Sequence, residues 1–299
     1  MHSKLKILWL QGITCNGNAH SFLNHPRLQT LLERLELLYH PLLPSTYSLE
    51  EVVNTFPQAD IIIFEGAYKA NFKRAGVTLE TILLGLQTHA SYIIATGTCA
   101  AYGGIMQLSD PQSSGLIYNN NNKQLLELID KQKLISIPGC PIHPEWLGYV
   151  LEMILYNKKI PLDDELRPQE LFAPLTHHGC DRNEYFEWKV DAKKFGEKEG
   201  CLYYEQGCRG VMTHSSCNKI LWNEVSSKTK AGTPCFGCTE SDFPRSNMFQ
   251  TKTNMSIPEE VPLGIGKKAY LTIAGIAKTF HIKRLEGKLI DYKKDHRKD

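Results

Sequence analysis

The sequence predicts an α/β half built on a parallel sheet, followed by a loop-rich half. In the first half, short apolar runs alternate with helix-like segments, which is the pattern of a parallel sheet covered on both faces. In the second half few periodic runs occur, and Gly, Pro, Asn, Thr and charged residues dominate. Six of the nine cysteines lie in this second half. Clustered thiols in a loop-rich segment indicate soft-metal ligation.

Four strands are expected in the first half. Each is a short run, rich in Ile, and most end at or near Gly. Because helix-like segments separate the runs, we expect the strands to be parallel. The expected ranges are Lys6–Gln11, Asp60–Glu65, Tyr92–Thr96 and Leu134–Ile137.

Five helices are expected around these strands, over Pro26–Tyr39, Leu49–Thr55, Thr78–Ala90, Lys123–Lys133 and Pro144–Tyr156. We place the domain boundary in the Pro-containing stretch that follows, which gives an α/β domain over residues 1–163 and a loop-rich domain over residues 164–299. Buried apolar side chains alone would hardly stabilise the second domain, so we expect bound metal to stabilise its fold.

Charge and hydropathy limit the classes of partner and location. The chain has 299 residues, 34 basic and 32 acidic, with a net charge of +2, which argues against nucleic acid or membrane as the main partner. The first apolar run, Ile7–Leu10, is shorter than the roughly 7–15 residues of a secretory segment, and Ala269–Ile282 is shorter than the roughly 20 residues of a spanning helix. We expect a cytoplasmic protein, either free or peripheral to a membrane.

Three cysteines follow strand-like runs in the first half. Cys15, Cys99 and Cys140 each lie a few residues after an expected strand, with Gly within three residues. The carboxyl ends of parallel strands share one edge of the sheet, and ligands bind in the crevice there. A single free cysteine is usually a buried, inert thiol, but three at the same topological position predict a shared site.

The other six cysteines form a second set of candidate ligands. Two spacings suit metal ligation: an H-x-x-C step and a C-x-x-C step. Structural zinc is the first competitor, since four-ligand sites of this kind are ordinary for zinc. Nine cysteines and one histidine do not divide into sets of four, however, and iron–sulfur clusters accept three-thiolate cores and an occasional His ligand. Iron–sulfur chemistry is therefore favoured over zinc. The second set is His177, Cys180, Cys201, Cys208, Cys217, Cys235 and Cys238.

In their joint order these motifs resemble the small subunit of nickel–iron hydrogenases over nearly the whole chain, and the resemblance accounts for all nine cysteines. The matching segments are Trp9-Leu10-Gln11-Gly12 before Cys15, Glu65-Gly66, Gly97-Thr98-Cys99-Ala100, Ile137-Pro138-Gly139-Cys140-Pro141, His177-x-x-Cys180, Gly200-Cys201-Leu202-Tyr203, Gly207-Cys208-Arg209-Gly210, Cys217, Trp222-Asn223 and Ala231-Gly232-x-Pro234-Cys235-x-Gly237-Cys238.

The resemblance implies a flavodoxin-like first domain and three iron–sulfur clusters in a row. A [4Fe–4S] distal cluster, a [3Fe–4S] medial cluster and a proximal cluster are implied. The implied ligands are Cys15, Cys99 and Cys140 (proximal), His177, Cys180, Cys201 and Cys208 (distal), and Cys217, Cys235 and Cys238 (medial).

The resemblance also implies partners. The nickel–iron site of the family belongs to a separate large subunit, so no catalytic residue is expected in this chain. It would carry electrons from H₂ oxidation to an external acceptor or an electron-carrier protein, in a dimer of heterodimers.

The sequence departs from the common family pattern at two places. Asn18 stands where the family usually has a fourth proximal cysteine; the Cys-x-Gly-Asn variant resembles the cytoplasmic uptake-type branch, as in cyanobacterial enzymes. The proximal cluster is then [3Fe–4S], or it is a [4Fe–4S] cluster with the Asn18 oxygen on its fourth iron. His20 is an alternative ligand for that iron, although its position argues against it. Lys228 replaces a common proline beside the medial cluster, where positive charge should raise the potential. Glu65 matches a carboxylate near the proximal cluster, or else serves as a strand-end hydrogen-bond acceptor.

Three other functions remain as alternatives. The first is the small subunit of a regulatory, H₂-sensing hydrogenase. The second is a zinc-stapled interaction protein without redox activity, which would lack the brown colour of an iron–sulfur protein. The third is a cluster subunit of a quinone oxidoreductase complex, which the six-cysteine second half disfavours.

Overall fold

The structure is a computed structural model of the chain, and it describes residues 4–119, 124–125, 129–246, 248–254 and 257–278. It divides into two compact units. The first consists of Met1–Ala173 and Cys238–Phe243, and the second of Pro174–Gly237 and Pro244–Asp299. The division after Ala173 falls later than the boundary expected after residue 163, and a short segment of the second half returns to the first unit.

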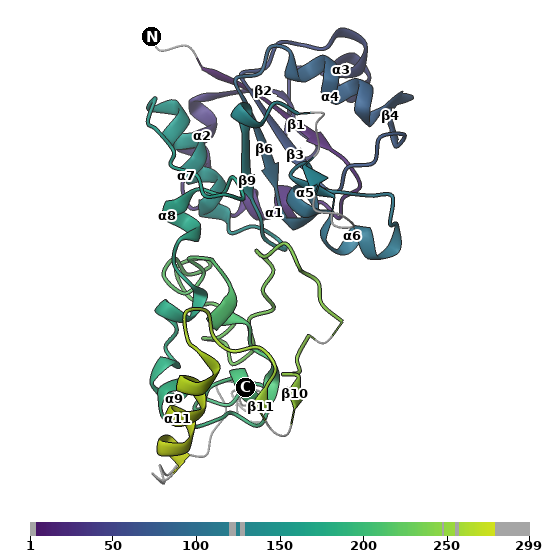
Figure 1. Cartoon of the computed structure of the whole chain (residues 1–299). Helices are drawn as coiled ribbons and strands as arrows, with labels where there is room; N and C mark the ends of the chain where they lie inside the picture. The colour runs from purple at the N-terminus through teal and green to yellow at the C-terminus, as the bar shows by residue number, and fades with distance from the viewer. Residues whose placement is uncertain (1–3, 120–123, 126–128, 247, 255–256, 279–299) are drawn as a thin grey trace, which may run out of the picture. The chain divides into compact units, whose positions relative to one another are not determined.

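A five-stranded parallel sheet forms the centre of the first unit (Figure 1). Its order is β2-β1-β3-β6-β9, with every neighbouring pair parallel. This order is that of flavodoxin-like folds, so the expected fold class is confirmed. The strands are β1 (Leu5–Gln11), β2 (Leu35–Tyr39), β3 (Ile61–Glu65), β6 (Tyr92–Thr96) and β9 (Leu134–Ile137).

Both faces of this sheet are buried, as the apolar strands require. Leu8 and Leu10 of β1 belong to a core formed with α3 (Leu49–Thr55) and α4 (Leu79–Gln87). Trp9 alternates with them and packs at 5.7 Å from Phe22 between ring centroids. Phe22 lies in α1 (Gly17–Leu23), which contacts α7 (Pro144–Leu155).

Local sequence signals explain where the expected helices begin. Ser48 accepts a hydrogen bond from the Glu51 N–H, and the Glu51 carboxylate accepts one from the Ser48 N–H, which forms a capping box for α3. The Thr78 hydroxyl accepts from Thr81 N at 3.4 Å at the start of α4. Pro144 occupies the first turn of α7, where its missing N–H costs nothing.

Two helix predictions were wrong in part. The segment Pro26–Tyr39 contains α2 (Leu28–Glu33) and then β2, because Leu35 and Leu38 are buried when β2 pairs with β1. Within 123–133, Gln124–Leu125 (β8) pairs with Tyr118–Asn119 (β7), and Lys131–Lys133 is a 3₁₀ turn, η1. Residues 123 and 126–128 of that prediction lie outside the described residues.

Other short elements of the first unit have bounds that the sequence did not predict. They are a hairpin of β4 (Lys73–Arg74) and β5 (Val77–Thr78), and the helices α5 (Thr98–Tyr102), α6 (Gly104–Ser109) and α8 (Gln169–Phe172). Of these, α5 positions a candidate ligand, since it begins directly after β6 and contains Cys99.

The second unit is loop-rich, as expected. Its small core consists of Phe186, Cys201, Tyr203, Val211 and Tyr270. No helix within the described residues is long and apolar enough to cross a membrane. The elements of this unit are η2 (Thr176–Gly179), α9 (Asn183–Glu187), α10 (Tyr203–Gln206), η3 (Gly210–Met212), β10 (Thr253–Asn254), β11 (Ile257–Pro258) and α11 (Lys267–Lys278).

Candidate functional site

The loops after β6 and β9 are joined at the carboxyl edge of the sheet. Thr98 N donates to Gly139 O at 3.0 Å, and Gly139 N donates back to the Thr98 hydroxyl at 2.9 Å. Cys99 and Cys140 are the next residues in the two loops. Thr98 is therefore a positioning residue that the sequence analysis did not single out, although it stands beside a candidate ligand.

The three predicted proximal cysteines lie within electrostatic reach of one another. Burial raises the pKa of Cys99 to about 11, and the nearby Cys140 and Cys15 thiols also raise it, while N–H groups of Met106 and Ile105 lower it. Cys15 and Cys140 are exposed and Cys99 is partly buried. The structure thus brings together three thiols that are far apart in sequence. A bound cation would favour their ionised form.

Glu65 ends β3 beside this site and is fully buried. Its carboxylate accepts hydrogen bonds from Trp9 Nε1 at 3.0 Å, Asn18 N at 2.9 Å and Ala19 N at 3.2 Å. Glu65 is therefore a strand-end acceptor that fixes the first turn of α1, which begins two residues after Cys15.

The four predicted distal ligands line one narrow cavity in the second unit, of about 20 Å³. These ligands are His177, Cys180, Cys201 and Cys208. Burial raises the pKa of Cys201 to about 12, despite a hydrogen bond from Tyr203 N that lowers it. The structure thus brings these four side chains to one cavity.

His177 has the protonation state that metal ligation requires. Burial lowers its pKa to about 4, and the charges of His178 and Lys189 add to the effect. Its ring lies edge-on to Phe186, with 4.6 Å between the ring centroids. A neutral imidazole held by a packed aromatic neighbour is suited to bind a metal. His178 is exposed, and its Nδ1 accepts from Leu175 N instead.

Arg182 lines the same cavity and was not predicted from the sequence. It is buried and donates to backbone carbonyls of Thr229 at 2.8 Å, Gly200 at 2.7 Å and Glu197. Its partners are main-chain atoms of distant loops, so no spacing in the sequence indicates it. The guanidinium places a positive charge beside the thiols.

Cys217 and Cys235, two of the predicted medial ligands, lie in the second unit. Burial raises the pKa of Cys217 to about 12, with a further rise from Cys235 and an opposing effect from Lys228. Lys228 Nζ lies 3.9 Å from the centroid of the Phe236 ring. The lysine thus adds positive charge near both thiols.

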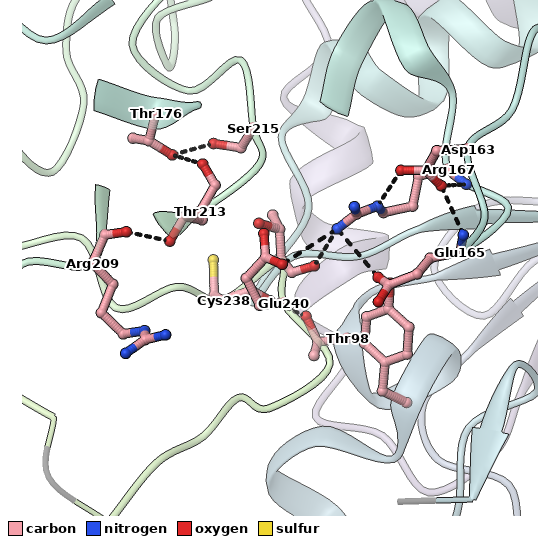
Figure 2. Close-up of polar contacts among 12 residues, drawn as sticks. Thr98, Asp163, Glu165, Arg167, Thr176, Arg209, Thr213, Ser215, Cys238 and Glu240 are labelled. Atoms are coloured by element: carbon pink, nitrogen blue, oxygen red, sulfur yellow. Dashed lines mark hydrogen bonds and ion pairs between the residues drawn. The ribbon is translucent and has the colours of Figure 1, made fainter. Parts of the chain in front are cut away.

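Two hydroxyls, those of Thr213 and Thr176, lie close to the Cys235 thiol, and Figure 2 shows them together with Ser215. The Thr176 hydroxyl is 2.8 Å from the Ser215 hydroxyl and donates to Thr213 O at 3.2 Å, and the Thr213 hydroxyl donates to Arg209 O at 2.7 Å. Burial raises the pKa of Cys235, whereas hydrogen bonds from the Gly237 N–H and from the Thr213 and Thr176 hydroxyls lower it. The Gly237 N–H stabilises negative charge on the sulfur. Each hydroxyl has one proton, so it does the same only when that proton turns from the carbonyl to the thiolate.

Cys238, the third predicted medial ligand, belongs to the segment that returns to the first unit. The Thr98 hydroxyl donates to Cys238 O, and Arg167 donates to Thr239 O at 3.4 Å and pairs with Glu240 at 3.6 Å (Figure 2).

The donor set fits iron–sulfur chemistry. All nine cysteines are free thiols, and burial raises the pKa of at least one in each predicted set. For these buried thiols the ionised form is unfavourable unless a metal supplies compensating charge. Within the part of the chain that the structure describes, no three His, Cys, Asp or Glu side chains are arranged to hold a single metal ion.

Two family models match different parts of the chain. The family model for the C-terminal part of NiFe/NiFeSe hydrogenase small subunits matches residues 172–250, and the model "NADH ubiquinone oxidoreductase, 20 Kd subunit" matches residues 15–154. The first match contains all six cysteines of the second half. The second match ends before this half.

Two curated relatives and one solved structure are informative. The chain is 29% identical to the periplasmic [NiFeSe] hydrogenase small subunit of Desulfomicrobium baculatum, over 81% of this chain and 85% of that one. It is 31% identical to the periplasmic [NiFe] hydrogenase small subunit 1 of Nitratidesulfovibrio vulgaris, over 79% and 78%. The H₂-activated D. baculatum [NiFeSe]-hydrogenase structure matches with a TM-score of 0.69 and 27% identity, over 84% of this chain and all of that one.

The fold and the matches to known proteins therefore define an electron-transfer subunit of a hydrogenase. The chain belongs to the family of nickel–iron hydrogenase small subunits. Members of this family carry iron–sulfur clusters and pair with a large subunit.

Proposed function

We propose that this chain is the electron-transfer small subunit of an uptake hydrogenase. It receives electrons from H₂ oxidation at the partner large subunit and passes them through three iron–sulfur clusters to an external acceptor or electron-carrier protein. The observation that carries the proposal is the distal cavity, where a neutral imidazole and three thiols from separate loops converge. A further support is the convergence of Cys15, Cys99 and Cys140 at the sheet edge.

The proposed ligand sets are those that the sequence implied. The donor set His177, Cys180, Cys201 and Cys208 suits a [4Fe–4S] distal cluster, and Cys217, Cys235 and Cys238 suit a [3Fe–4S] medial cluster. Three thiols, Cys15, Cys99 and Cys140, serve the proximal cluster, which is [3Fe–4S] or [4Fe–4S]. When bound, these groups supply one-electron redox chemistry. The chain's own residues bind them, exclude water and set their electrostatic surroundings.

We also propose that the protein is cytoplasmic and that it assembles with the large subunit into a dimer of heterodimers. Its support is the Cys15-Asn16-Gly17-Asn18 variant, which resembles the cytoplasmic uptake-type branch, whereas the two relatives compared above are named periplasmic. Cell fractionation followed by size measurement of the purified complex tests this part. Recovery of the protein with the periplasmic fraction would contradict it.

The test of the function compares the purified small subunit, reconstituted with iron and sulfide, with the complex that contains the large subunit. We expect H₂-dependent dye reduction only from the complex, because the nine thiols are all assigned to clusters and leave none for a nickel site. Iron and sulfide counts and electron paramagnetic resonance give the cluster types. Dye reduction by the small subunit alone would overturn the proposal, and a stably co-purifying kinase would favour the sensing role instead.

A further inference from the structure

Asn18 stands where a fourth proximal thiol is usual in the family, yet its amide is already occupied at both ends. Nδ2 donates to Thr96 O at 3.3 Å, and Oδ1 accepts from Ile142 N at 2.9 Å. The residue is 7% exposed, so water does not compete for these contacts.

These contacts join the three loops that contain the proximal cysteines. Asn18 itself follows Cys15, Thr96 ends β6 ahead of Cys99, and Ile142 follows Cys140. The side chain therefore links the loop of each predicted ligand to the other two. The backbone of Asn18 is fixed as well, since its N–H donates to the buried Glu65 carboxylate at 2.9 Å.

The neighbouring glycine is adapted to this arrangement. Gly97 has φ +92, and an added Cβ would collide with the Asn18 amide nitrogen. Glycine is thus required for its conformation and for the close approach of the amide. The Asn18 amide therefore packs directly against the backbone of Gly97, just after β6.

We propose that Asn18 is a positioning residue, which holds the three cysteine loops at their mutual distances, and that it is not a ligand to the proximal cluster. The amide oxygen points into a backbone hydrogen bond, and a neutral amide is a weak ligand for iron beside thiolates. Cluster ligation in the first unit then rests on three thiolates alone. This inference rests on the proposed proximal site at Cys15, Cys99 and Cys140.

Amide hydrogen exchange of Ile142 in the anaerobically purified complex tests the positioning role. Asn18→Ala removes the acceptor of the Ile142 N–H and should speed its exchange about tenfold, equal to about 1.4 kcal/mol of local opening free energy. The matched control is Asn24→Ala. Asn24 caps the same helix, and its amide donates to His20 O at 2.9 Å at an exposed position. The control should leave Ile142 exchange unchanged.

Asn18→Asp separates positioning from ligation. A carboxylate retains an acceptor for the Ile142 N–H and is a better iron ligand than an amide, but it loses the donor to Thr96 O. A positioning role predicts that the Asp variant loses iron to a chelator at least as fast as the native complex. Slower iron loss from Asn18→Asp, or Ile142 exchange within twofold of native in Asn18→Ala, would overturn the proposal. Neither readout depends on H₂ turnover, so failure of the proposed function would be seen separately.

Discussion

His40, at the end of the β2 edge strand, is a buried titratable residue whose charge state is set by packing. It is 4% exposed, and its ring lies 4.9 Å from that of Trp9 in an edge-on arrangement. Its Nδ1 accepts from Leu42 N and Leu43 N, both at 3.1 Å. Burial lowers its pKa from 6.5 to about 4. The folded protein therefore holds this histidine neutral.

This depressed pKa predicts a loss of stability in mild acid. Between pH 6.5 and pH 4 the unfolded chain binds a proton at His40 that the folded chain does not, so stability falls as the pH falls through this window. Once His40 has titrated in both states, this pKa difference lowers the free energy of unfolding by about 3 kcal/mol. His40→Asn retains an acceptor for the two N–H groups without a titrating ring. We expect its melting temperature to fall less steeply between pH 6.5 and pH 4.5 than that of the native chain.

The control for this prediction is His89→Asn, at an exposed histidine of the first unit. It should give the native pH dependence. If the His40 and His89 variants show the same slope of melting temperature against pH, burial of His40 does not contribute to acid sensitivity.

Single residues also show what the sequence can reveal about the site. Cys15, Cys99 and Cys140 were predictable because their positions after strands place them at one edge of a parallel sheet. Arg182 and Thr98 were not, since their contacts are with backbone atoms of other loops. Such contacts depend on the path of the main chain, which leaves no spacing signal.

Arg167 shows how a buried ion pair attaches one segment to another within the first unit. Its side chain pairs with Asp163 at 2.8 Å, Glu165 at 3.3 Å and Glu240 at 3.6 Å, and it is 5% exposed as a residue. Glu240 lies in the segment that also contains Cys238. The Arg167 guanidinium therefore links the acidic residues just before it in the chain to the segment 238–243 (Figure 2).

Removal of this cation should be costly. Arg167→Met leaves three carboxylates gathered without their shared partner, and breaking a buried pair in this way costs about 3–5 kcal/mol. The control is Arg27→Met, which breaks the exposed pair of Arg27 and Glu152 at 2.8 Å and should cost at most about 1 kcal/mol. Thermal unfolding of the full chain measures both. Equal losses for the two variants would show that the Arg167 cluster is no stronger than a surface pair.

Elements differ in how well their sequences predict them. The four buried strands β1, β3, β6 and β9 were predicted because each is a compact apolar run. The edge strand β2 was not, since Leu35 and Leu38 are spaced three apart, which suits one face of a helix better than one face of a strand. Its pairing with β1 decides the outcome, and that tertiary contact is not encoded in the local pattern.

At the scale of the whole molecule, the two units differ in what holds them together. The first has an extensive apolar core on the sheet, from β1, β3 and β6 to α3 and α4. Among its described residues, the second has a small core around Phe186, Tyr203 and Tyr270, with one of the candidate ligands, Cys201, among its members. The sequence predicted this contrast from periodicity alone, but not the return of residues 238–243 to the first unit.

This contrast predicts that iron removal unfolds the units unequally. Ordering each residue costs about 1–2 kcal/mol, which the small core of the second unit cannot offset without bound metal. After chelation of iron from the full chain, trypsin should cleave within residues 174–237 well before it cleaves within the sheet of the first unit. The iron-loaded chain, digested in parallel, should resist in both. Cleavage of both units at the same rate after chelation would mean that the second unit folds without its metal, because the segments that bear His177, Cys201 and Cys217 would then be held by packing alone.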